Sequence, residues 1–226
     1  MKIVIFEPHP DDLLFGPGPI LLQWIKEGHD IHIITVTDGR ALFRGGGDVY
    51  APDVQNFSED EVASMRIEEA KQVLNFLGLT EQAQTFLRFQ DAEGQKYVAE
   101  AIERVKPLLK GIDRLVLPSD NNLHVDHQAT HDIAIGAAKE LQLKEIEYFV
   151  YFVAAYGKFQ EDSEQHQIQI PLSEEMRKKL FEWLNIYESQ KKAKYNWKMY
   201  NRFLKKWDTA TYGLFKWEDM GKYHNF

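Results

Sequence analysis

The chain contains 226 residues, with 27 Lys plus Arg against 35 Asp plus Glu, so its formal net charge is −8. With 44% hydrophobic and 27% charged residues, the composition is typical of a folded globular protein, and we expect a single α/β domain over residues 1–226. The acidic balance disfavours binding to nucleic acid or to an anionic membrane, because both need a basic surface.

The absence of cysteine narrows the chemistry of the chain. It excludes disulfides, iron–sulfur clusters, thiol nucleophiles and cysteine-ligated zinc, so a metal would have to be held by His, Asp, Glu and water. No apolar run approaches the roughly 18 residues that span a bilayer, so we expect no membrane insertion. The apolar run at residues 3–6 is too short for a signal peptide, and the expected location is the cytoplasm.

The first 40 residues predict a strand, a helix and a second strand. Residues 2–6 form a β-branched apolar run that two nearby prolines terminate. Residues 19–27 carry apolar side chains at helical spacing and are followed by Gly28, which favours a left-handed C-terminal cap. Residues 31–37 form a second apolar strand. Such a βαβ unit implies parallel strands with a right-handed crossover.

The rest of the chain continues to alternate between helices and strands. Residues 41–57 lack periodicity and predict a long loop, of a kind that often acts as a lid. Ser58 and Glu61 have capping-box spacing, at the start of a helix that runs to Gly78. We therefore expect a three-layer, Rossmann-like α/β fold with a mainly parallel sheet and helices on both faces. The further predicted elements are strands near 86–89, 115–117 and 146–153 and helices at 95–105, 128–141, 173–187 and 193–207, followed by an aromatic-rich tail.

Two clusters of side chains that can bind metals follow predicted strands. His9-Pro10-Asp11-Asp12 comes directly after the first strand, and His124-Val125-Asp126-His127 follows the strand at 115–117. Because ligands bind beyond the carboxyl ends of strands in an open parallel sheet, both clusters can reach the same edge. Each alone has an ordinary explanation, as a helix-capping turn or a polar loop. Together, in a chain without cysteine, they predict a metal site.

A hydrolytic zinc site needs about three nitrogen or oxygen ligands and an open position for water. His9 and Asp12 can converge on one ion if a turn or a helix start follows the strand. His127, at a helix N-terminus, is the best placed third ligand. We therefore expect zinc, or another divalent metal, to be held by these three residues.

Hydrolysis also needs a base and a group that stabilises the developing negative charge. Asp11 lies between two expected ligands and faces a different direction from Asp12, so it suits the general base that takes a proton from water. His124, with Asp126 nearby, can act as an oxyanion stabiliser or as an acid. The pattern predicts metal-assisted hydrolysis of an acyl bond.

The order of these motifs resembles that of a known enzyme family. Gly16 and Gly18 follow the first cluster, and the second cluster comes more than 100 residues later. Between and after them, Arg66-Ile67-Glu68-Glu69 is similar to the family's Arg-x-x-Glu helix, and Tyr187-Glu188-Ser189-Gln190 to its Tyr-x-Ser-Gln segment. The family is that of the PIG-L/LmbE-like zinc-dependent N-deacetylases, which remove acetyl groups from N-acetylglucosamine-containing substrates.

The resemblance implies the same metal ligands, base and oxyanion stabiliser, with Asp126 tuning His124. It adds Arg66 and Asp91 as contacts to sugar hydroxyls, and a small N-acetylated sugar as the substrate. Family members are often oligomeric, and aromatic residues near the C-terminus could cover a subunit interface, so the resemblance leaves homo-oligomerisation open.

Three positions depart from the family pattern. Leu13 stands where an acidic residue usually follows the aspartate pair, Pro19 interrupts the usual glycine pair, and Asn122 occupies a position that is often acidic. None of them removes an inferred ligand or the base, although Leu13 and Pro19 can change how the loop after the first strand is held. Two alternatives stay open. One is a non-catalytic sugar- or metal-binding protein on the same scaffold, and the other is a hydrolase of a non-sugar amide or ester.

Overall fold

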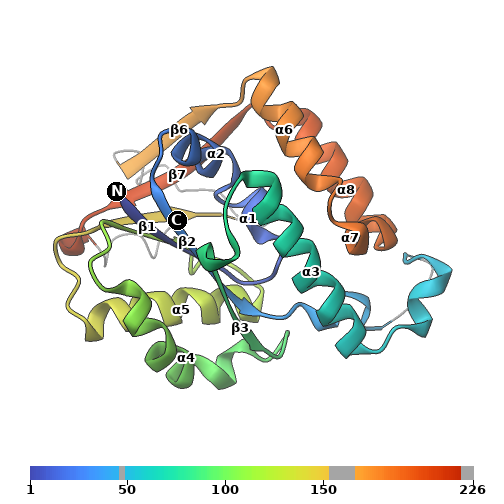
Figure 1. The fold of residues 1–226 in the computed structure, drawn as a ribbon, viewed down its shortest axis with the longest axis horizontal. Helices are drawn as coiled ribbons and strands as arrows, with labels where there is room; N and C mark the ends of the chain where they lie inside the picture. The colour runs from blue at the N-terminus through green and yellow to red at the C-terminus, as the bar shows by residue number, and fades with distance from the viewer. Residues whose placement is uncertain (46–48, 153–165, 220–226) are drawn as a thin grey trace.

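A computed structural model of the chain describes residues 1–45, 49–152 and 166–219. Its centre is a seven-stranded sheet with the strand order β3-β2-β1-β4-β5-β7-β6 (Figure 1). The first five strands in this order are parallel, and β7 runs antiparallel to both of its neighbours. The mainly parallel sheet is therefore confirmed. The strands are β1 (Lys2–Glu7), β2 (Asp30–Thr37), β3 (Gln84–Phe89), β4 (Arg114–Pro118), β5 (Glu147–Tyr151), β6 (Gln167–Pro171) and β7 (Thr209–Phe215).

Helices cover both faces of the sheet, as the alternating pattern predicted. Ile3 and Ile5 of β1 pack with α2, α3, α6 and α8 on one face, and Val4 and Phe6 pack with α4 and α5 on the other (Figure 1). All four side chains are fully buried. Within the described ranges, no helix is both long and apolar enough to cross a membrane. The helices are α1 (Asp12–Phe15), α2 (Gly18–Lys26), α3 (Glu59–Leu77), α4 (Val98–Val105), α5 (Val125–Glu140), α6 (Glu174–Leu184), α7 (Glu188–Lys192) and α8 (Lys194–Lys206).

The position of β1 in the sheet determines where a site can form. β1 pairs in parallel with β2 on one side and with β4 on the other, so Ile5 lies beside both Ile33 and Val116. The strand order reverses here, which makes β1 and β4 the two sides of a topological switch point. The segments that follow β1, β2, β3 and β4 therefore gather at one edge of the sheet.

Local signals in the sequence account for several element boundaries. The predicted capping box is present, because the Ser58 side chain accepts from the Glu61 N–H and the Glu61 carboxylate accepts from the Ser58 N–H. Gly28 follows the last turn of α2 with φ of 77°, in the left-handed region. α5 begins three residues earlier than predicted, since the His124 side chain caps it by accepting from the Asp126 N–H. Histidine is not among the usual N-cap residues.

Other predicted boundaries need correction. The helix expected at 95–105 is divided into a 3₁₀ turn at Gly94–Tyr97 and α4, and the helix expected at 173–187 ends at Leu184. The expected lid at 41–57 contains 3₁₀ turns at Arg40–Phe43 and Pro52–Asn56. Residues 46–48 of that segment, and Val153 of the expected strand 146–153, lie outside the described residues.

Sequence analysis did not predict β7 and β6, the last two strands in the order of the sheet. The segment interpreted as an aromatic-rich tail contains β7, whose Ala210 and Tyr212 are buried against the core. β6 pairs with β7 over Gln167–Pro171, and it alternates polar and apolar residues in a run too short to be distinctive. Its position in the sheet depends on tertiary pairing with β7.

We expect Ser58→Ala to lower the free energy of unfolding by about 1 kcal/mol, because it removes the capping box of α3. Urea denaturation measures the change. Ser64→Ala, at an exposed position inside the same helix, is the matched control and should change stability by less than half as much. Equal losses in the two variants would show that the cap contributes nothing specific.

Candidate active site

A cavity of about 240 Å³ opens at the carboxyl ends of the parallel strands. Five of the six predicted metal and catalytic residues line it, together with both predicted sugar contacts. Asp126, the sixth, is fully buried behind His9. The lining residues are His9, Asp11, Asp12, Ala41, Leu42, Arg66, Asp91, Ala92, His124, His127, Gln190, Asn196 and Tyr200.

The three predicted metal ligands converge at one side of this cavity. Oδ2 of Asp12 lies 2.9 Å from Nδ1 of His9 and 3.4 Å from Nε2 of His127. Their ligand atoms all lie within 4.8 Å of one another, and all three residues are buried. Two imidazole nitrogens and one carboxylate oxygen are ligands that zinc accepts, so the residues present fit the metal.

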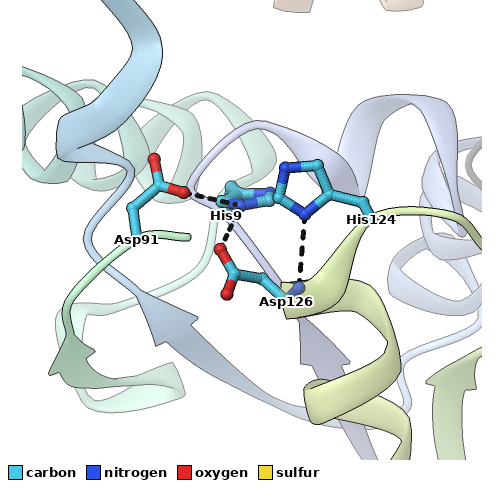
Figure 2. A group of neighbouring side chains, drawn as sticks. All are labelled: His9, Asp91, His124 and Asp126. Carbon is cyan, nitrogen blue, oxygen red and sulfur yellow. Dashed lines mark hydrogen bonds and ion pairs between the residues drawn. The ribbon is translucent and has the colours of Figure 1, made fainter. Parts of the chain in front are cut away.

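The other nitrogen of His9 faces two carboxylates. Nε2 lies 3.1 Å from Oδ2 of Asp126 and 3.3 Å from Oδ1 of Asp91 (Figure 2). Carboxylates are acceptors, so Nε2 carries a proton. Nδ1 faces the carboxylate of Asp12 and is the nitrogen on the side of the other two predicted ligands. Burial alone would lower the pKa of His9, but the charges of Asp91, Asp12 and Asp126 outweigh it and hold that pKa well above the usual range.

Backbone amides fix the two carboxylates in place. Asp126 accepts from the N–H of Ala92 at 2.7 Å and from the N–H of Gly94 at 2.8 Å. A Cβ on Gly94 would lie 2.7 Å from Oδ1 of Asp126, so the close approach requires glycine. Asp91 accepts from the Ala41 N–H at 3.0 Å. Burial would raise the pKa of Asp91, but the charge of His9 holds it well below its usual range.

The carboxylate and the backbone of Asp126 contact two different histidines. Its carboxylate contacts His9, and only its backbone N–H reaches His124, donating to Nδ1 at 3.3 Å (Figure 2). An N–H can only donate, so Nδ1 of His124 is unprotonated and the ring proton is on Nε2. Burial lowers the pKa of the half-buried His124, and the neighbouring His9 lowers it further. His124 is therefore a neutral hydrogen-bond donor.

Asp11 is held between two side chains from distant parts of the chain. Its Oδ1 forms an ion pair with Arg66 of α3, and its Oδ2 accepts from Nε2 of Gln190 in α7 at 2.7 Å. Burial raises the pKa of Asp11, and the positive charge of Arg66 opposes the rise. The sequence contained Gln190 within its Tyr-x-Ser-Gln segment but gave no sign that this side chain reaches Asp11.

The two predicted sugar contacts have protein partners in this structure. Nη1 of Arg66 donates to the Gly39 carbonyl at 2.9 Å, and Gly39 adopts φ of 68°, where a side chain would collide with the guanidinium. Nε of Arg66 is buried without a hydrogen-bond partner among the described residues. Arg66 and Asp91 both line the cavity, and their contact with a sugar stays a prediction.

A buried acid contacts the backbone of the segment that carries His9 and Asp12. Glu7, the last residue of β1, accepts from the Thr35 hydroxyl at 2.5 Å, from the Gln84 amide at 3.2 Å and from the Leu13 N–H at 3.3 Å. Burial raises the pKa of Glu7 to about 8. A carboxyl group therefore holds the backbone of Leu13, the position where the family usually has an acidic side chain. Sequence analysis did not single out Glu7, although an acid at the end of an apolar strand is unusual.

Together, the fold and the cavity define an α/β protein with a histidine- and aspartate-lined site at the switch point of its sheet. Residues 4–138 match the family model described as PIG-L, GlcNAc-PI de-N-acetylase. This match covers more than half of the chain, and the protein belongs to the PIG-L family. Membership of this family supports the interpretation of the protein as an enzyme of the deacetylase type. No curated protein matches the chain.

Solved structures share the fold over nearly the whole chain. The N,N′-diacetylchitobiose deacetylase of Pyrococcus horikoshii has a TM-score of 0.69 and 17% identity, covering 97% of this chain and 85% of its own. The zinc-inhibited form of teicoplanin deacetylase has a TM-score of 0.67 and 16% identity, covering 97% of this chain and 100% of its own. The 4-carboxy-2-hydroxymuconate hydratase GalB of Pseudomonas putida KT2440 has a TM-score of 0.58 and 15% identity, covering 95% of each chain. The fold alone therefore does not determine the reaction.

The buried state of His127 predicts a pH dependence of stability in the metal-free protein. Burial lowers the pKa of His127 from 6.5 to about 4, so between these values the unfolded chain binds the proton and the folded chain does not. The contribution of His127 is complete above pH 6.5 and is lost as the pH falls toward 4, with a slope of up to about 1.4 kcal/mol per pH unit.

Urea denaturation of metal-free protein from pH 7 to pH 4.5 measures this slope. His127→Gln should flatten it. His29→Gln, which removes a surface histidine beside Glu27, controls for the loss of one imidazole. If the stability of His127→Gln changed with pH as steeply as that of the unmodified chain, the slope would have to come from groups other than His127.

Proposed function

We propose that the protein is a zinc-dependent N-deacetylase that hydrolyses the acetamide group of an N-acetylglucosamine-type sugar. The observation that carries the proposal is the position of the Asp11 carboxylate, in the same cavity as the convergent His9, Asp12 and His127. When bound by those three residues, zinc supplies Lewis acidity toward the acetyl carbonyl and the attacking water.

Asp11 is the general base in this proposal. Its carboxylate takes a proton from the water that attacks the acetyl carbon, and its raised pKa favours that transfer at neutral pH. Gln190 and Arg66 fix the orientation of the carboxylate, because each contacts a different oxygen. The proton is then given to the leaving nitrogen as the C–N bond breaks, which yields acetate and a free amine.

His124 stabilises the negative charge that develops on the acetyl oxygen. The Asp126 N–H occupies Nδ1, so Nε2–H remains to donate to the oxyanion. A neutral donor is consistent with the lowered pKa of His124. Asp126 and Asp91 contribute by holding His9 in the tautomer that presents Nδ1 to the metal.

The substrate class is proposed from the family and its neighbours. The family model is described by a deacetylase of a GlcNAc-containing compound, and one neighbour deacetylates diacetylchitobiose. A neighbouring deacetylase is described in a zinc-inhibited form, so zinc acts on a protein of this fold, and the proposal of zinc here rests on the donor set His9, Asp12 and His127. Hydrolysis of a non-sugar amide or ester is the second candidate, because GalB uses the same fold for a compound that is not a sugar.

We expect Asp11→Asn to lower turnover of N-acetylglucosamine or diacetylchitobiose by about 10²–10⁴-fold while one zinc per chain is retained, because the base is lost and the ligands are not. His127→Ala should lose zinc and activity together. Amine release is measured by derivatisation and zinc by elemental analysis.

Asp38→Asn provides the matched control. Asp38 is also buried and paired with an arginine, Arg40, but it does not line the cavity, so this variant should keep most of the activity. Near-normal turnover by Asp11→Asn would refute the base assignment. If the unmodified protein turned over only non-sugar acyl compounds from an extended panel, the second candidate would replace the first.

A further inference from the structure

Asn122 is a buried residue of the segment between β4 and α5, and every polar group on it is engaged. Its backbone N–H donates to the Asp120 carbonyl at 2.9 Å, and its backbone carbonyl accepts from the Gln128 side chain at 2.7 Å. Its side-chain oxygen accepts from the His124 backbone N–H at 2.8 Å. The residue is 6% exposed. Its amide is therefore held in one orientation.

That orientation directs the amide nitrogen at a proposed metal ligand. Nδ2 of Asn122 lies 3.2 Å from Nδ1 of His127. An amide nitrogen donates, so it suits His127 only while Nδ1 is unprotonated. In that tautomer the proton is on Nε2, which is the nitrogen beside Asp12.

Zinc binding would require the opposite tautomer of His127. Nε2 of His127 is its metal-side nitrogen, so a neutral ring that binds zinc there must carry its proton on Nδ1. Asn122 then faces two donors, the His124 N–H and the His127 Nδ1–H. Its side chain has one acceptor, Oδ1, which can serve only one of them in a given orientation. Turning the amide over satisfies His127 and leaves the His124 N–H unpaired, so either orientation loses one hydrogen bond.

We propose that Asn122 is a positioning residue that weakens zinc binding at this site, and that a carboxylate in its place would tighten it. The inference rests on the proposed metal site. A carboxylate has two acceptor oxygens, one for each donor, and an acceptor on the second nitrogen of a histidine ligand fixes its tautomer and raises its basicity. An amide at a position where the family often has an acid would therefore lower the affinity for zinc.

The test compares Asn122→Asp with Asn121→Asp. Both variants add the same charge, one residue apart, but Asn121 is exposed and its backbone N–H bonds to Ser119. The zinc dissociation constant is measured by competition with a chromophoric chelator on metal-free full-length protein at pH 7.5, without substrate. We expect Asn122→Asp to bind zinc at least tenfold more tightly and Asn121→Asp to stay within threefold of the unmodified chain.

The rise in unfolding temperature on zinc addition is recorded in parallel, so that an Asn122→Asp protein with a less stable metal-free form still reports its zinc affinity. A larger zinc-induced rise than in the unmodified chain supports the inference. Zinc affinity of Asn122→Asp within threefold of the unmodified chain overturns it, and so does equal tightening in Asn121→Asp, which would reduce the effect to general charge. Failure of the deacetylase proposal appears separately, as zinc binding by the unmodified chain without amine release.

Discussion

His9 is the residue on which the geometry of the site depends. It is the first polar side chain to enter the cavity after β1, and its two ring nitrogens face different partners, Asp12 on one side and Asp91 with Asp126 on the other. The acids on Nε2 hold a proton there, and Nδ1 is the nitrogen that the proposed metal site uses. Asp91, Asp12 and Asp126 together hold the pKa of His9 well above its usual range, against the effect of burial. A metal ion held by Nδ1 of His9 would therefore compete with a proton, as expected for histidine ligands.

The sheet topology explains why these partners can meet. Asp91 follows β3, Asp126 lies in the first turn of α5 after β4, and His9 follows the central β1. Each of the three side chains therefore comes from the segment after a different parallel strand. Backbone amides of Ala92 and Gly94 anchor Asp126 before any ligand is present. The site is thus organised by strand ends, caps and backbone donors, and a bound metal would enter a set of ligands that is already in place.

The sequence predicted more of the fold, and of the set of side chains that gather in the cavity, than of the contacts between those side chains. Apolar periodicity indicated the parallel strands, and local spacing indicated His9 and Asp12 as candidate metal ligands. It could not pair Asp126 with His9, which lies 117 residues away, because His124 is the nearer histidine in the chain. Nor could it place Gln190 on Asp11 across 179 residues. β6 was not predicted for a related reason, since a five-residue edge strand is defined by its partner more than by its own residues. β7, its partner, lay within the segment interpreted as an aromatic-rich tail.

The protonation of His9 is the most direct test of the account. Long-range ¹H–¹⁵N correlation spectra of the zinc-loaded protein, with ¹⁵N-labelled histidine and a His9→Gln variant for assignment, distinguish a protonated from a metal-bound ring nitrogen. We predict a proton on Nε2 of His9 and a metal-shifted Nδ1. A proton on Nδ1, with zinc on Nε2 or absent from the ring, would contradict the arrangement proposed for the site.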